Sequence, residues 1–150
     1  MNAEMVKEGS GSAKATWITN FTFLPMGEER VQINYEGYGG VLGGTGEGLL
    51  DNASAHVVGS LHVFKGCYDD DSGFICYTRP DGDQTFATYK CAGEAGKGGK
   101  GTFTFVGGTG KFVGLQGSGQ FTRTMLPSPA KEVGASFADS EYTWKIVGTK

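Results

Sequence analysis

The stretch from Gly101 to Phe121 reads GTFTFVGGTGKFVGLQGSGQF, and it constrains the fold of this chain more than any other feature. It contains two short runs of apolar-alternating residues, FTFV and QF, separated by glycine turns and a short FVGL insert. A period of two is typical of β-strands, and glycines at such short intervals let the chain turn sharply between them. The pattern predicts a closed or strongly bent antiparallel sheet.

The same punctuation runs through the whole chain, because glycine makes up 27 of its 150 residues. A helical domain would avoid so much glycine, since each one costs about 1 kcal/mol relative to Ala inside a helix. About eight candidate strands follow one another at intervals that fit a barrel or a sandwich. They are expected at residues 15–24, 30–42, 55–64, 74–79, 84–91, 101–108, 115–126 and 141–148.

We therefore predict an all-β fold, with a single closed antiparallel eight-stranded β-barrel over residues 14–150 and little or no helix. Residues 1–13, rich in Glu, Lys, Gly and Ser, are predicted to form a flexible leader. A long loop is expected after the seventh strand, with a helical turn within residues 131–140. A barrel of eight strands is either filled by its own side chains or holds one small ligand.

Charge, hydropathy and cysteine usage limit the expected partners, the location and the redox state of the thiols. The net charge is −3 and the densest positive segment is GKGGKG, so nucleic acid is not an expected partner. No apolar run approaches the ~18 residues that span a bilayer, and the N-terminus has no apolar signal core, so we expect no membrane partner and a cytoplasmic location. Cys67, Cys76 and Cys91 are odd in number and form no CxxC pair, which fits reduced thiols.

No motif indicates a cofactor or a metal. The GGTGKF segment differs from a phosphate-binding loop, which would have glycine in place of Phe105 and Ser or Thr in place of Phe112. His56 and His62 lie ~20 Å apart on a straight strand, too far to bind one metal ion. The run Asp69–Asp71 lacks the spacing of a calcium loop and is expected to be a solvated hairpin tip. We therefore expect neither a cofactor nor a bound metal ion.

The segment GGTGKFVGLQGSGQF resembles the allene oxide cyclase-like and dirigent-like β-barrel superfamily, in which a GGTGxFxxxxGxG segment joins two neighbouring strands. The stretches YEGYGGVLGGTGEG and DNASAHVVGSL resemble small bacterial members, and the resemblance covers roughly residues 15–147. It implies an antiparallel barrel, often trimeric, with an apolar cavity for a small hydrophobic molecule. Plant members close an oxylipin ring or steer radical coupling. No catalytic residue of the cyclase can be matched to a position here.

The hairpin over residues 74–91 offers the most usable geometry. A turn at Pro80–Asp83 would set Arg79 opposite Gln84 and Phe74 opposite Tyr89. Only one face of the hairpin can look into the barrel. The cavity wall would then carry one of two sets, either Phe74, Cys76, Thr78 and Tyr89, or Ile75, Tyr77, Arg79, Phe86 and Thr88.

From these observations we predict a cofactor-independent isomerase, cyclase or lyase that acts on a small hydrophobic molecule in the cavity. The candidate acid–base residues are Tyr35, Glu36, His56, Cys76 and Tyr89. Each has a structural alternative, since Glu36 can face solvent and Cys76 can be a small core residue. Two other functions stay open, a non-catalytic binder of an apolar ligand and an assembly module with a filled barrel. Two or more polar groups converging in the lumen would favour the enzyme.

Overall fold

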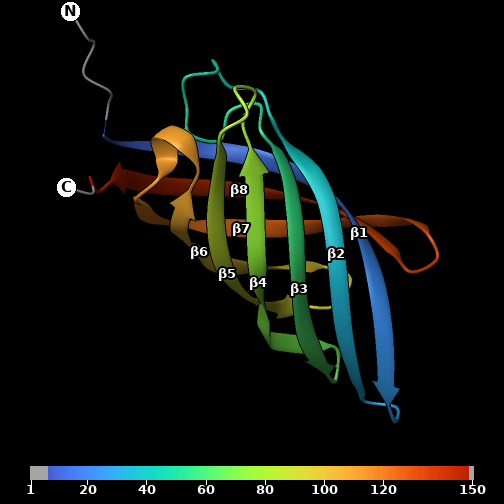
Figure 1. Ribbon diagram of the computed structural model, residues 1–150. Coiled ribbons are helices and arrows are strands. Elements are labelled where there is room, and N and C mark those ends of the chain that lie inside the picture. Colours follow the sequence, from blue (N-terminus) through green and yellow to red (C-terminus); the bar gives the residue numbers. More distant parts are fainter. Residues whose placement is uncertain (1–6, 149–150) are drawn as a thin grey trace, which may run out of the picture.

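The computed structural model describes residues 7–148, which form one closed barrel of eight antiparallel strands in sequence order (Figure 1). This confirms the predicted fold class, and the only helix among these residues is a 3-10 turn, η1 at Gly110–Phe112. No helix within residues 7–148 is long and apolar enough to cross a membrane. The strands are β1 (Glu8–Met26), β2 (Arg30–Leu42), β3 (Ser54–Phe64), β4 (Cys67–Thr78), β5 (Gln84–Glu94), β6 (Gly98–Gly108), β7 (Leu115–Ala130) and β8 (Val133–Ile146).

Strand β1 closes the barrel. Its first part pairs with β8 from Glu8 to Asn20, and its second part pairs with β2 from Lys14 to Met26. Figure 1 shows β1 bending as it passes from one neighbour to the other. Residues 8–13 therefore lie in this strand, although the sequence placed them in a leader; residues 1–6 of that leader are outside the described part of the chain.

The C-terminal part of the chain differs from the prediction. The helical turn expected within residues 131–140 is absent, because β8 begins at Val133 and pairs with both β7 and β1. Glu132, with φ at +61°, makes the tight connection between β7 and β8. Pairing on both sides satisfies the backbone groups of this segment better than an isolated helical turn would.

One end of the barrel is plugged. The loop between β2 and β3 places Leu49 and Leu50 in the lumen, where they are almost fully buried together with Phe112 of η1 and Leu115 of β7. Arg79 fixes this loop by donating from Nη1 to the carbonyl of Leu49 at 2.6 Å. The glycine-rich segment that dominates the sequence thus helps to close one end, and any cavity must open at the other.

Candidate functional site

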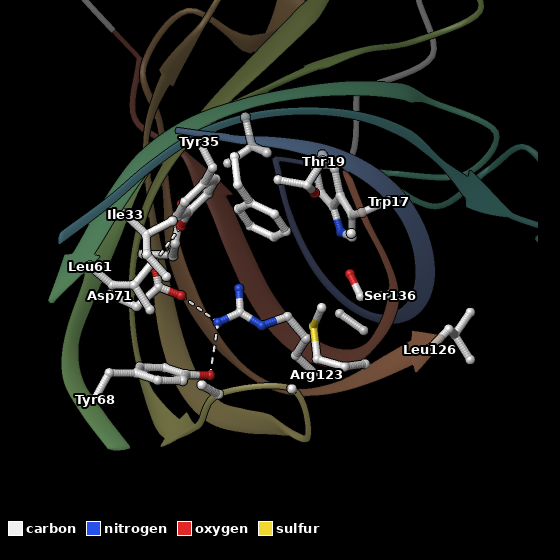
Figure 2. A pocket seen from close by; sticks show the side chains of 18 of the residues that line it. Trp17, Thr19, Ile33, Tyr35, Leu61, Tyr68, Asp71, Arg123, Leu126 and Ser136 are labelled. Carbon is white, nitrogen blue, oxygen red and sulfur yellow. Dashed lines mark hydrogen bonds and ion pairs between the residues drawn. The ribbon is translucent and has the colours of Figure 1, made fainter. Parts of the chain in front are cut away.

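A cavity of about 520 Å³ occupies the other half of the lumen (Figure 2). It reaches the surface between the β5–β6 and β7–β8 hairpins, since Gly96 and Glu132 are among its lining residues. Its volume lies within the range of about 300–1,000 Å³ that is usual for small-molecule sites. Most of the wall is apolar, with side chains that include Trp17, Phe21, Phe23, Ile33, Val57, Leu61, Val63, Ile75, Phe103, Phe121, Met125 and Leu126.

Polar groups converge on one wall of this cavity. Asp71 of β4 is only 1% exposed and forms an ion pair with Nη2 of Arg123 from β7. The hydroxyl of Tyr35 donates to the other carboxylate oxygen of Asp71, and it also bonds to the hydroxyl of Tyr89. Figure 2 shows the guanidinium reaching across the lumen towards Asp71 and Tyr68. Four strands therefore supply a single buried hydrogen-bond network.

The network has a defined direction. An ionised carboxylate only accepts hydrogen bonds, so the proton of Tyr35 is committed to Asp71. Tyr89 must then donate to the oxygen of Tyr35, because that oxygen is the only part of the Tyr35 hydroxyl left to bond. The chain of donors runs from Tyr89 through Tyr35 to Asp71. It ends at a carboxylate whose second oxygen is held by Arg123.

Burial shapes the acid–base properties of these groups. Burial, together with the charge of Asp71 and the Tyr89 phenol, raises the pKa of Tyr35 far above its ordinary value. Burial also raises the pKa of Tyr89, although the bond to Tyr35 opposes part of that shift. Burial alone would lower the pKa of Arg123, but Asp71, Cys91 and Tyr68 together outweigh it and the net shift is upward. Both phenols are therefore neutral and the guanidinium is charged at neutral pH.

Glycines let the two phenols meet. Tyr35 pairs with Gly59 of β3, Gly59 pairs with Gly73 of β4, and Gly73 pairs with Tyr89 of β5. A Cβ atom at Gly59 would lie 2.6 Å from the Tyr35 hydroxyl and closer still to that of Tyr89. A Cβ atom at Gly73 would lie 2.9 Å from the Tyr89 hydroxyl. The two side chains thus lie over a bare stretch of sheet.

An irregularity in β4 brings two polar side chains of one strand to Arg123. The pairing of β4 with β5 shifts between Tyr68 and Asp71. Both residues are buried although they are three positions apart, whereas inward positions in a regular strand are two or four apart. Arg123 donates from Nη2 to the Tyr68 hydroxyl at 3.3 Å and to Sγ of Cys91 at 3.1 Å. The same nitrogen therefore contacts three side chains besides facing the lumen.

Two of the five candidate residues, Tyr35 and Tyr89, lie in this network. Glu36 and His56 lie on the outer surface of the barrel, where each side chain is about half exposed and His56 Nε2 is 3.6 Å from Oε1 of Glu36. Tyr38 stacks on His56 with ring centroids 4.6 Å apart. Cys76 is opposite His56 on this same outer face, and burial raises the pKa of the Cys76 thiol. The cavity is not lined by Glu36, His56 or Cys76.

The predicted register of the 74–91 hairpin was wrong by one residue. Thr78, rather than Arg79, is opposite Gln84, and Gly73, rather than Phe74, is opposite Tyr89. The inward face therefore mixes the two sets that the sequence left open. It carries Ile75 and Tyr77 from one set and Tyr89 from the other.

Sequence reasoning missed Asp71 and Arg123. The run Asp69–Asp71 was expected to be a solvated hairpin tip, but β4 begins at Cys67 and Asp71 is buried. Counting back in steps of two from the inward Tyr77 reaches Asp71, so strand parity could have found it. Arg123 follows the inward Phe121 by two residues and could have been found in the same way. Within residues 7–148 no group of three or more His, Cys, Asp or Glu could hold a metal ion.

Comparison with known proteins finds similarity among solved structures and none in sequence. No protein-family model matches the chain, and no curated protein matches its sequence. Among solved structures, the chain is similar to the pterocarpan synthase dirigent protein GePTS1, with a TM-score of 0.45 and 11% identity over 99% of this chain and 91% of that one. It is similar to the pterocarpan synthase dirigent protein PsPTS1 at the same TM-score and identity, over 95% of this chain and 98% of that one.

Proposed function

We propose that this protein is a cofactor-independent enzyme that binds a small hydrophobic molecule in its lumen and rearranges it by proton transfer. The observation that carries the proposal is the buried network of Tyr89, Tyr35, Asp71 and Arg123 on the wall of an otherwise apolar cavity. An assembly module with a filled barrel would have neither this cavity nor a charged pair on its wall. Converging polar groups in an apolar pocket are typical of an active site.

The network suits removal and return of a proton. A carbon acid held beside Tyr89 would pass its proton to the Tyr89 oxygen while the Tyr89 proton moves to Tyr35 and the Tyr35 proton moves to Asp71. The electron pair left on the substrate moves onto its oxygen, where the Arg123 guanidinium stabilises the negative charge. Reversal at a different carbon gives an isomerase, and expulsion of a leaving group gives a lyase.

Occupancy of the cavity is tested first. The neutral fluorophore N-phenyl-1-naphthylamine should bind the wild-type protein with increased emission. The variant Ala138→Phe, which adds a ring to the cavity wall, should reduce this binding at least tenfold, whereas Val58→Phe on the outer surface should not. Equal binding by all three proteins would overturn a role for the lumen.

Proton transfer is tested with 2-tetralone, an apolar ketone with acidic α-protons, whose exchange with D₂O is followed by ¹H NMR. The wild-type protein should accelerate exchange, and Tyr35→Phe and Tyr89→Phe should each lower the rate by about 10²–10⁴-fold because either one interrupts the relay. Tyr38→Phe is the matched control, since it removes a phenol from the outer surface. Exchange at the buffer rate with bound ketone would overturn catalysis.

A non-catalytic binder is the second candidate. It is favoured by the pairing of the network within the protein, because both oxygens of Asp71 already have partners. For such a protein, the fluorophore experiment would succeed and the exchange experiment would show no acceleration by the wild-type protein.

A further inference from the structure

We infer that the ligand of this cavity carries a neutral carbonyl oxygen, bound by Arg123, and that the site discriminates against carboxylates of the same shape. The inference rests on the proposed function, because it specifies the polar group that the proposed ligand presents to the network.

Arg123 has N–H donors on the cavity wall that bond to no other protein atom in the described part of the chain. All three of its hydrogen bonds, to Asp71, Tyr68 and Cys91, come from Nη2. Within residues 7–148, Nε and Nη1 have no hydrogen-bond partner. A guanidinium presents five N–H donors and no acceptor, so an oxygen acceptor on the ligand is the group that would satisfy those left over. When an apolar ligand displaces water from the cavity, leaving these donors unbonded would be costly.

The charge of Arg123 is already balanced. Asp71 contacts the guanidinium directly and is almost fully buried, so the pair is neutral as a unit. A carboxylate placed against the free donors would also lie near Asp71, and two anions in a poorly solvated space repel each other. A carbonyl oxygen accepts the same hydrogen bonds without that repulsion.

The rest of the lining adds negative charge. Besides Asp71, the cavity is lined by Glu94 and Glu132 at its mouth, and Arg123 is its only cationic lining residue within residues 7–148. Glu94 forms an exposed ion pair with Lys97 at 3.0 Å, which screens part of its charge. An anionic ligand would thus pass two carboxylates to reach a guanidinium that a third one already neutralises. Three acids against one base favour a neutral molecule.

The test uses three rigid ligands of nearly equal shape. These are 2-acetylnaphthalene, which has a carbonyl, 2-isopropenylnaphthalene, which has none, and 2-naphthoate, which is an anion at pH 7.5. Each competes with N-phenyl-1-naphthylamine for the full-length protein. The ketone should bind about tenfold more tightly than the alkene, as a hydrogen bond to a charged donor allows. The carboxylate should bind at least tenfold more weakly than the ketone.

Arg123→Lys shows whether this preference comes from the guanidinium. Lysine keeps the charge beside Asp71 but lacks the planar set of donors. The variant should lose the tenfold preference for the ketone while binding the alkene as the wild type does, and that retained binding shows that the barrel is folded. Equal wild-type affinities for ketone and alkene, or tightest binding of 2-naphthoate, would overturn the inference. If none of the three displaces the fluorophore, the proposed function fails as well.

Discussion

Breaking the Asp71–Arg123 pair from one side should destabilise the barrel more than replacing both partners. Removing one member of a buried ion pair typically costs about 3–5 kcal/mol, because the remaining charge is left uncompensated, whereas an apolar replacement of both is often close to neutral. Asp71 is 1% exposed, while the Arg123 side chain is 19% exposed and faces a cavity that water can enter. Arg123→Met should therefore cost more than Asp71→Leu, because the abandoned carboxylate is the less hydrated charge.

The double variant Asp71→Leu/Arg123→Met should lose only about 1–3 kcal/mol, since its main remaining penalty is that one of the two phenols, Tyr35 or Tyr89, lacks an acceptor. Urea unfolding followed by tryptophan fluorescence measures these values. Thermal unfolding checks them, because each kcal/mol shifts the Tm of a chain this long by about 2–4 °C. Asp139→Asn is the control, since its pair with Lys14 is half exposed and should contribute less than about 1 kcal/mol. A double variant as unstable as the sum of the two singles would refute the reasoning.

Three further outcomes follow from the same geometry. The raised pKa values of Tyr35 and Tyr89 mean that the unfolded chain releases protons which the barrel holds. The contribution of these two phenols to stability should therefore be constant from pH 7 to 9 and fall above about pH 10 by up to ~1.4 kcal/mol per pH unit for each phenol. Tyr35→Phe should lessen the slope above pH 10 in urea titrations, and an unchanged slope would contradict the assignment. Gly59→Ala should push the two hydroxyls apart and lower the rate of 2-tetralone exchange more than it lowers fluorophore binding. In thiol labelling at pH 8 the exposed Cys67 should react fast and the buried Cys91, whose pKa burial raises, should react slowly; a fast phase that survives in the double variant Cys67→Ser/Cys76→Ser would show otherwise.

The strands could be predicted because their alternation and glycine punctuation are local properties. The register of the 74–91 hairpin could not, because it depends on how the turn closes. The N–H of Arg79 bonds to the carbonyl of Asp83 at 2.9 Å, which leaves a three-residue loop with Gly82 at φ +89°. The predicted turn had four residues, Pro80–Asp83, and this loss of one residue moves one strand by one position relative to its partner. That single residue decides which side chains share the face with Tyr89.

Only part of the candidate site, Tyr35 and Tyr89, could be nominated from the sequence. Tyr35 and Tyr89 are aromatic residues in clear strands, and such residues can be nominated before their partners are known. Glu36 and His56 are polar residues in equally clear strands, but they fall on the outer face, where alternation puts polar groups by default. Arg123 and Asp71 are charged, and charged residues are rarely buried unless paired. Strand parity places Asp71 on the face of Tyr77 and Arg123 on the face of Phe121. That the two residues pair with each other becomes predictable only once β4 and β7 are known to face each other across the lumen.

The three consecutive aspartates at positions 69–71 show how the fold limits the charge it buries. A regular β4 counted inward from Tyr77 would place Asp69 as well as Asp71 in the lumen, setting two carboxylates against one guanidinium. The shift in pairing between Tyr68 and Asp71 prevents this, because it turns Tyr68 inward and leaves Asp69 and Asp70 exposed. Oδ1 of Asp70 then accepts a hydrogen bond from the backbone N–H of His62 at 3.0 Å. The pairing of β3 with β4 is also interrupted there. The irregularity thus supplies Arg123 with one carboxylate and one phenol, so that Asp71 and Arg123 form a pair with no net charge. Such a pair suits the uncharged ligand that we propose for this cavity.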